Sequence, residues 1–113
     1  SLEPSFAMTR EFVKRKQKVL ELIKNIPGLR CAVPDGAFYI FPEVNNYFGK
    51  SAGNHKINNA DDLCMYLLNE AHVSTVTGSA FGNDECIRIS FANSMEKIEE
   101  GFRRITKAFA QLQ

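Results

Sequence analysis

The stretch DECIRISFANS (84–94) constrains the fold more than any other part of the chain. Ile87, Ile89 and Phe91 alternate with more polar residues, and successive side chains of a strand point to opposite faces. The alternation therefore predicts a strand with one face buried against an apolar layer. The opposite face of this strand carries Cys86, Arg88 and Ser90.

The residues after this strand predict an amphipathic helix that can supply the apolar layer. Apolar side chains recur there at steps of three and four, at Ile98, Phe102, Ile105, Phe109 and Leu112. We expect Asn93 to cap the helix, with Glu96 three residues later in a pattern like a capping box. A strand and a helix that each have one apolar face can bury both by packing together.

The rest of the chain predicts further elements of the same two kinds. They are a helix over 4–26, a strand over 37–41 after a turn at PDG, a helix after Asn59 and a strand over 72–76. Residues 45–59 are polar and rich in Gly and Asn, so we expect a flexible loop there. The order predicts a single α+β domain over 1–113, a two-layer sandwich with helices packed mainly on one face of a small sheet.

Composition argues against several classes of function. The formal net charge of +1 gives no reason for the surface as a whole to attract nucleic acid or a membrane. The basic residues of the first helix (10–18) are typical of a solvated face or of one that packs on another domain. No apolar run approaches the roughly 20 residues that span a bilayer. We therefore expect neither nucleic acid nor a membrane as a partner.

Cysteine and histidine usage points to a protein of the cytoplasm that binds no metal. The three cysteines are odd in number and lack CxxC spacing, which favours reduced thiols over disulfides or a zinc site. His55 and His72 have no neighbours at the spacing of a metal site.

Arg88 is the strongest candidate for a binding residue, and two interpretations of it are comparable. It could be an ordinary surface arginine on the solvent side of a half-covered sheet. Alternatively, a planar guanidinium on a rigid strand suits bidentate binding of a carboxylate better than a flexible lysine does. The alternation alone does not separate these interpretations.

Three segments together carry a resemblance to a known family. VPDGAFYIFPEV (33–44), LLNEAHVSTVTGSAFG (67–82) and CIRISFANSMEKIEEGFRRI (86–105) resemble the C-terminal part of class I/II, fold-type-I, pyridoxal-phosphate-dependent aminotransferases. The likeness is closest to the aspartate aminotransferase branch and covers the chain from Phe6 onward. It implies a C-terminal small domain that closes over an amino-acid substrate in a larger enzyme of amino-acid metabolism.

The resemblance also implies roles for particular residues. Arg88 matches the family's arginine that binds the substrate α-carboxylate, and Gly36 and Phe81 match positions that shape the pocket. Two departures are Thr77, where the family commonly has proline, and the acidic pair at 84–85, where it commonly has glycine. Both change the loop before the arginine strand and leave Arg88 in place.

The cofactor half of such a site has no match in this sequence. Nothing resembles the serine-rich motif of the lysine that forms the Schiff base, and Lys50 and Lys56 lie in the polar segment without that context. We therefore expect pyridoxal phosphate in the full-length enzyme only, held by its large domain, and no catalytic residue, bound cofactor or activity in this chain alone. The resemblance further implies a homodimeric enzyme that acts on amino acids, aspartate among them, and 2-oxo acids.

Two other classes of function stay open at this stage. The chain could be a stand-alone regulatory module that binds an amino acid on an α+β sandwich. It could also be an interaction domain whose basic first helix contacts a partner protein.

Overall fold

The computed structural model describes residues 2–32 and 38–113, so the predicted turn at PDG and Gly36 lie outside the described residues. The helices are α1 (Leu2–Ile23), α2 (Ala60–Tyr66), its π-helical continuation η2 (Leu67–Ala71) and α3 (Met95–Ala110). Two short 3-10 turns are η1 (Asn45–Tyr47) and η3 (Gly78–Phe81). The strands are β1 (Arg30–Ala32), β2 (Tyr39–Glu43), β3 (Ser51–Ala52), β4 (His55–Lys56), β5 (Val76–Thr77) and β6 (Ile87–Ser90).

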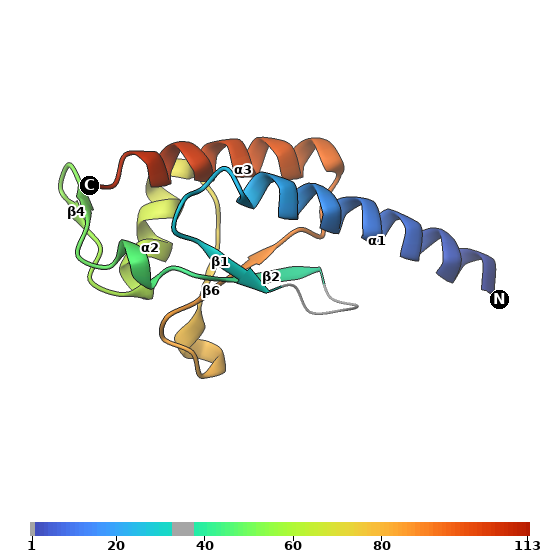
Figure 1. The fold of residues 1–113 in the computed structure, drawn as a ribbon, viewed down its shortest axis with the longest axis horizontal. Helices are drawn as coiled ribbons and strands as arrows, with labels where there is room; N and C mark the ends of the chain where they lie inside the picture. The colour runs from blue at the N-terminus through green and yellow to red at the C-terminus, as the bar shows by residue number, and fades with distance from the viewer. Residues whose placement is uncertain (1, 33–37) are drawn as a thin grey trace.

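Four of these strands form one antiparallel sheet in the order β1-β2-β6-β5. In its register Ile40 lies opposite Ile89, and Val76 lies opposite Arg88. Helices α1 and α3 lie on one side of these strands, whereas η3 projects on the other side (Figure 1). The predicted α+β fold, with helices packed mainly on one face of a small sheet, is confirmed.

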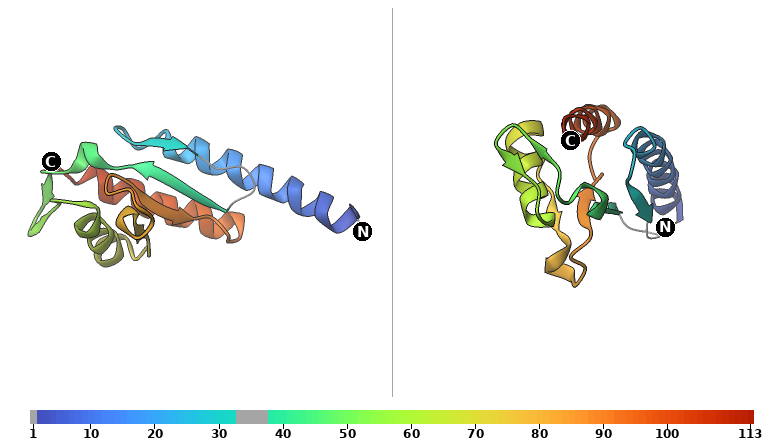
Figure 2. Two further views of the ribbon diagram at one scale, coloured as in Figure 1. Left: turned by 90° about the horizontal axis from the view of Figure 1, so that it is seen from below. Right: turned by 60° about the vertical axis from the view of Figure 1, so that its left-hand side comes forward.

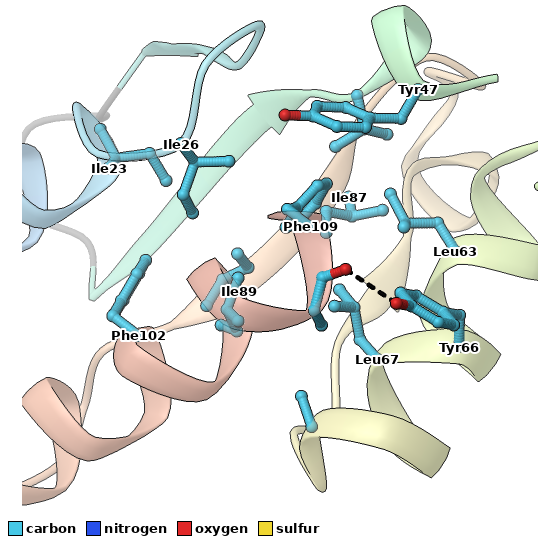
Figure 3. Close-up of a cluster of buried hydrophobic side chains, with 14 of the residues drawn as sticks. Ile23, Ile26, Tyr47, Leu63, Tyr66, Leu67, Ile87, Ile89, Phe102 and Phe109 are labelled. Carbon is cyan, nitrogen blue, oxygen red and sulfur yellow. Dashed lines mark hydrogen bonds between the residues drawn. The ribbon is translucent and has the colours of Figure 1, made fainter. Parts of the chain in front are cut away.

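The core lies between the helices and this covered face of the sheet. Ile40, Ile87 and Ile89 are buried there together with the whole predicted stripe of α3. The same cluster includes the apolar side chains of α2 and η2, namely Leu63, Tyr66, Leu67 and Ala71. The Tyr66 hydroxyl donates a 2.7 Å hydrogen bond to the Ala108 carbonyl of α3 (Figure 3). Both amphipathic helices thus have the buried faces that their periodicity predicts.

Helix α1 packs on this layer through its C-terminal part. Val19 and Ile23 are buried, as is Ile26 just after the helix. The Lys18 ammonium lies 3.9 Å from the Glu99 carboxylate of α3. The N-terminal half of α1 extends beyond the other elements (Figure 2). Part of the basic face of the first helix therefore contacts α3.

The N-cap of α3 differs from the prediction by one residue. Ser94, rather than Asn93, has the extended backbone of a cap, and its hydroxyl accepts a 3.3 Å hydrogen bond from the Lys97 amide. Both residue types are good caps, so the sequence pattern alone did not distinguish them. Glu96 consequently lies in the first turn, where a carboxylate stabilises the helix end, and is not the partner in a capping box.

The predicted strand over 72–76 is also corrected, because it is reduced to Val76–Thr77. His72 adopts a left-handed backbone conformation with φ of 56° and ends the preceding helical segment. Its amide donates to the Leu67 carbonyl, which satisfies a helix-end acceptor in the manner of a C-cap.

The segment 45–59, expected to be a flexible loop, contains η1 and the β3–β4 hairpin. Two of its side chains, Tyr47 and Ile57, are buried. The Tyr47 hydroxyl donates to the Pro27 carbonyl, and its ring meets that of Phe109 edge-on at 4.6 Å. These contacts anchor the segment at two points, and its flexibility stays a prediction.

Candidate functional site

Arg88 lies in the middle of β6, on the face of the sheet opposite to the core. Its neighbours Ile87 and Ile89 are buried beneath the helices, whereas Arg88 itself is half-buried. Its guanidinium carbon lies over the ring of Tyr39, 4.4 Å from the ring centroid. Because Tyr39 pairs with Ser90 in the register, it is the diagonal cross-strand neighbour of Arg88. The sheet therefore holds the arginine between fixed strands.

Aromatic side chains surround Arg88 on this open face. The pairing of β2 with β6, continued by one residue, puts Phe41 opposite Arg88. The Phe41 ring meets Phe81 of η3 nearly edge-on, at 5.2 Å between centroids and 78° between planes. Tyr39 and Phe81 are 38% and 40% exposed, so this aromatic face is accessible to a ligand or to another domain.

Gly78 is the residue that allows η3 to carry Phe81 to this face. Its amide donates to the Cys86 carbonyl, and its carbonyl accepts from the Asn83 amide, both at 2.8 Å. A Cβ at this position would lie 1.9 Å from the Asn83 carbonyl oxygen and 2.4 Å from that of Cys86. Only glycine allows the backbone to close so tightly there.

The two departures from the family pattern both contribute to this turn. The Thr77 hydroxyl accepts a 3.4 Å hydrogen bond from the Ser79 amide and so caps η3. The Ser79 hydroxyl in turn donates to the Asp84 carboxylate at 3.0 Å. Thr77 and Asp84 thus support the loop geometry, and neither side chain forms an ion pair with Arg88.

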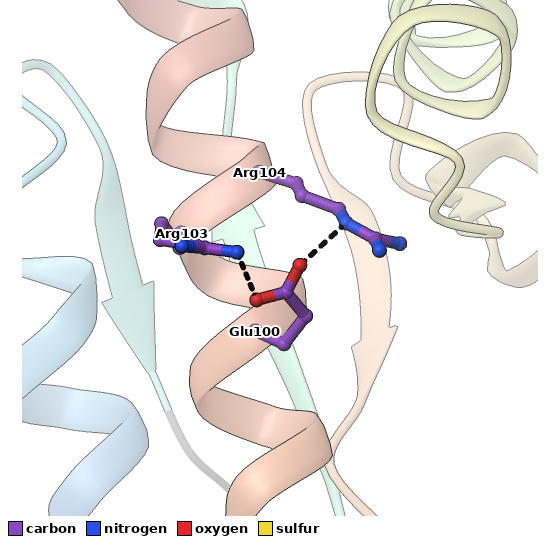
Figure 4. Close-up of polar contacts among 3 residues, drawn as sticks. All are labelled: Glu100, Arg103 and Arg104. Carbon is purple, nitrogen blue, oxygen red and sulfur yellow. Dashed lines mark hydrogen bonds and ion pairs between the residues drawn. The ribbon is translucent and has the colours of Figure 1, made fainter.

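Two other arginines of the described residues already bind a carboxylate. On α3, both Arg103 and Arg104 bind the Glu100 carboxylate, Arg104 at 3.0 Å (Figure 4). Hydrogen bonding to Arg103, together with the charges of both guanidinium groups, lowers the pKa of Glu100. Among the residues that the structure describes, no carboxylate forms an ion pair with Arg88.

The three thiols have the properties of packed side chains and not of nucleophiles. Burial raises the pKa of Cys64 and Cys86, and it raises the pKa of Cys31 to about 11. A thiol with a raised pKa is mostly protonated near neutral pH and is a poor nucleophile.

Residues 2–32 and 38–113 contain neither a cluster of metal ligands nor a helix suited to a membrane. No group of three or more His, Cys, Asp or Glu side chains in these ranges could hold a metal ion. None of the helices described combines the length and the apolar character needed to cross a membrane.

The structure brings two of the three predicted site residues to one face and adds two more. Arg88 and Phe81 share the open face, whereas Gly36 lies outside the described residues. Tyr39 and Phe41 were not singled out from the sequence. The alternation in YIFPE, which puts both on the face opposite Ile40, was the signal that could have identified them.

Comparisons with known proteins agree on one family. The family model described as aminotransferase class I and II matches residues 5–105. The bifunctional aspartate aminotransferase and glutamate/aspartate-prephenate aminotransferase of Petunia hybrida is 39% identical over 93% of this chain and 22% of its own length. The aspartate aminotransferase of Rhizobium meliloti is 40% identical over 92% of this chain and 26% of its own length.

Solved structures give the same result for the fold. The crystal structure of the Rhizobium meliloti aspartate aminotransferase superposes with a TM-score of 0.88 over 93% of this chain and 26% of that one. The aromatic aminotransferase of Pyrococcus horikoshii, 31% identical, gives 0.81 over 96% of this chain and 27% of that one. The chain thus spans about a quarter of the length of these relatives. Because the family model matches residues 5–105, which is nearly the whole of this chain, the chain belongs to the class I and II aminotransferases.

Proposed function

We propose that the chain is the substrate-carboxylate-binding small domain of a pyridoxal-phosphate-dependent aminotransferase. In this proposal Arg88 binds the α-carboxylate of an amino acid, and Phe81 and Gly36 shape the pocket around it. The full-length enzyme exchanges an amino group between an amino acid, aspartate in the first instance, and a 2-oxo acid. The names of the relatives, which are aspartate and prephenate aminotransferases, support this substrate class.

One observation carries the proposal: Arg88 has no carboxylate partner among the described residues and lies on the open face of a rigid strand. A guanidinium presents paired N–H donors that match the two oxygens of a carboxylate. The half-buried, aromatic surroundings strengthen such a pair, because they displace part of the water that would screen it. Arg103 and Arg104 are less suitable because Glu100 already occupies them.

The open face also supports a role as one wall of a site. Exposed Tyr39 and Phe81 flank the arginine, and a second domain placed on this face would bury them together with the substrate. Such closure excludes water and fixes the orientation of the bound amino acid. The large domain of the full-length enzyme, in a homodimer, is the partner that we propose for this face.

The described residues do not themselves make up a site for pyridoxal phosphate. No lysine in this part of the chain lies on the four-stranded sheet beside Arg88, and Lys50 instead lies over the Tyr47 ring at 5.3 Å. A cofactor that reacts through a lysine amine therefore needs residues from outside this chain. For this reason we propose that the chain alone is inactive.

Replacing Arg88 in the full-length enzyme tests the assignment. Removing one partner of a buried charge pair costs about 2–5 kcal/mol or more, so Arg88→Ala should lower kcat/KM for the amino acid by about thirtyfold or more. Arg88→Lys keeps the charge without the bidentate geometry and should give an intermediate loss. Wild-type efficiency in Arg88→Ala would contradict the proposal.

Calorimetric titration of the 113-residue chain provides a second test. The proposal expects no tight binding of amino acids or dicarboxylates, because this chain supplies only one wall of the site. Tight binding by the chain alone would favour the regulatory module instead.

A further inference from the structure

We infer that Tyr39 positions the Arg88 guanidinium for carboxylate binding, through its ring and not through its hydroxyl. The inference rests on the proposed function of Arg88 and adds a positioning residue to it. The observation behind it is the 4.4 Å distance between the guanidinium carbon and the Tyr39 ring centroid.

The contact has the geometry of a cation–π interaction. A guanidinium within about 6 Å of an aromatic centroid is attracted by the negative face of the ring. An aromatic ring attracts the cation without accepting a conventional hydrogen bond, so the N–H donors of Arg88 stay available to a carboxylate ligand. Tyr39 can therefore hold Arg88 without competing for its donors.

Tyr39 is itself held from both sides along β2. At the preceding residue, the Phe38 carbonyl accepts a 2.8 Å hydrogen bond from the Phe91 amide, and the two rings lie 5.6 Å apart. At the following residue, buried Ile40 pairs with Ile89 in the register. The backbone of Tyr39 thus has little freedom, so the point from which its ring extends towards Arg88 is fixed.

A fixed support matters because a free arginine side chain samples many rotamers. Ordering it upon ligand binding costs free energy, and an arginine that is already ordered avoids part of that cost. Since the benefit is the same in the bound ground state and in the transition state, loss of the ring should raise KM and leave kcat nearly unchanged.

Kinetics of the full-length enzyme give the first test. Tyr39→Leu should raise KM for the amino acid by about three- to fivefold, the effect of an exposed cation–π contact, with kcat within about twofold. Tyr39→Phe, the matched control that keeps the ring, should remain within about twofold of wild type in both constants. Tyr39→Ile is a second ringless variant, suited to a strand, for use if the leucine variant does not fold.

A double-mutant cycle separates positioning from a general structural effect. In an Arg88→Ala background, Tyr39→Leu should cause no further rise in KM, because the group that it positions is gone. A substrate analogue that keeps the amino group of the amino acid but lacks its α-carboxylate should react equally well with wild type and Tyr39→Leu. If Tyr39→Leu impairs the amine as much as the amino acid, the role of Tyr39 is structural and the inference fails.

Nuclear magnetic resonance of the 113-residue chain provides a readout that is independent of activity. The Arg88 Nε–H proton should show an upfield ring-current shift that persists in Tyr39→Phe and disappears in Tyr39→Leu. If that shift is absent from the wild-type chain, the inference fails.

The outcomes for the two proposals are distinguishable. If Arg88→Ala retains wild-type kcat/KM, the proposed function itself fails and the inference fails with it. If Arg88→Ala is impaired while Tyr39→Leu has wild-type KM, only the positioning role is overturned.

Discussion

On one face of β6, Ile87 and Ile89 are 0% and 3% exposed beneath the helices, whereas on the other face Arg88 is half-buried beside an exposed tyrosine. The two faces are separated only by the alternation of a four-residue strand. The covered face is apolar throughout and stabilises the domain by burial. The open face combines one guanidinium with three aromatic rings and leaves them accessible.

Alternate residues of this one strand therefore belong to the core and to the face on which we propose that substrate binds. Because the core holds β2 and β6 in register, the side chains on the open face extend from fixed backbone positions. Sites on strands of a packed scaffold are held more accurately than sites on loops. Substitutions on the two faces should therefore have separable effects.

The largest expected effect is a difference in the free energy of unfolding between variants of two neighbouring residues on opposite faces of β6. Ile89→Ala should lower the free energy of unfolding by about 3 kcal/mol, because it leaves a cavity under α3. Arg88→Ala should lower it by about 1 kcal/mol or less, because it removes only a half-buried contact with Tyr39 and leaves no cavity in the core. Urea denaturation of both variants measures the difference. Equal losses would show that the two faces are not independent.

A smaller loss of stability should follow from adding a side-chain carbon at Gly78, in the turn that carries Phe81 to the open face. Gly78→Ala forces a Cβ against two backbone carbonyls and should cost about 2 kcal/mol. Gly101→Ala is the matched control, since a Cβ there would meet nothing within 4 Å beyond its chain neighbours and the backbone of its own helix. Alanine also favours a helix by about 0.5–1 kcal/mol over glycine. Thermal unfolding should thus show opposite shifts in Tm. A neutral Gly78→Ala would mean that η3 can relax and is not a fixed support for Phe81.

Periodicity in the sequence predicts which residues form the covered face of the sheet, but it does not predict the contacts on the open face. The α3 stripe and the pair Ile87 and Ile89 follow from periodicity, because burial of a whole face requires many residues at regular spacing. The contact of Tyr39 with Arg88 depends on the register between two strands that lie far apart in the chain, which periodicity does not contain. Gly36, assigned from resemblance alone, lies outside the described residues.

The shortest strands are not predicted from the sequence, for a related reason. Strand β1 and the β3–β4 hairpin have two or three residues per strand, too few for an alternation to be recognised. Their pairing depends on tertiary partners, such as the reciprocal hydrogen bonds of 2.9 and 3.0 Å between Ser51 and Gln113. Tyr47 is buried within a polar segment because Phe109 and Pro27 provide its contacts, and both lie far from it in the sequence.

The smallest expected effect concerns two cysteines on the two faces. Cys31 lies opposite Pro42 on the covered side and packs against the core, and burial raises its pKa from 9.0 to about 11. Cys86 lies on the side of Arg88, and burial raises its pKa in the same direction. We expect both thiols to ionise at a higher pH than a free thiol, because burial disfavours the charged thiolate on either face.

The sign of the linkage gives a stability prediction for Cys31. Its pKa is higher in the folded state than in the unfolded state, so the contribution of Cys31 is complete below pH 9 and is lost as the pH rises towards 11. Urea denaturation at several values of pH between 8 and 11 should show falling stability, with a shallower fall in Cys31→Ala. The absorbance of the thiolate, followed against pH in Cys86→Ala and in Cys31→Ala, separates the titration of Cys31 from that of Cys86. A wild-type stability that does not fall as the pH rises towards 11, or an equally steep fall in Cys31→Ala, would contradict the burial that raises this pKa.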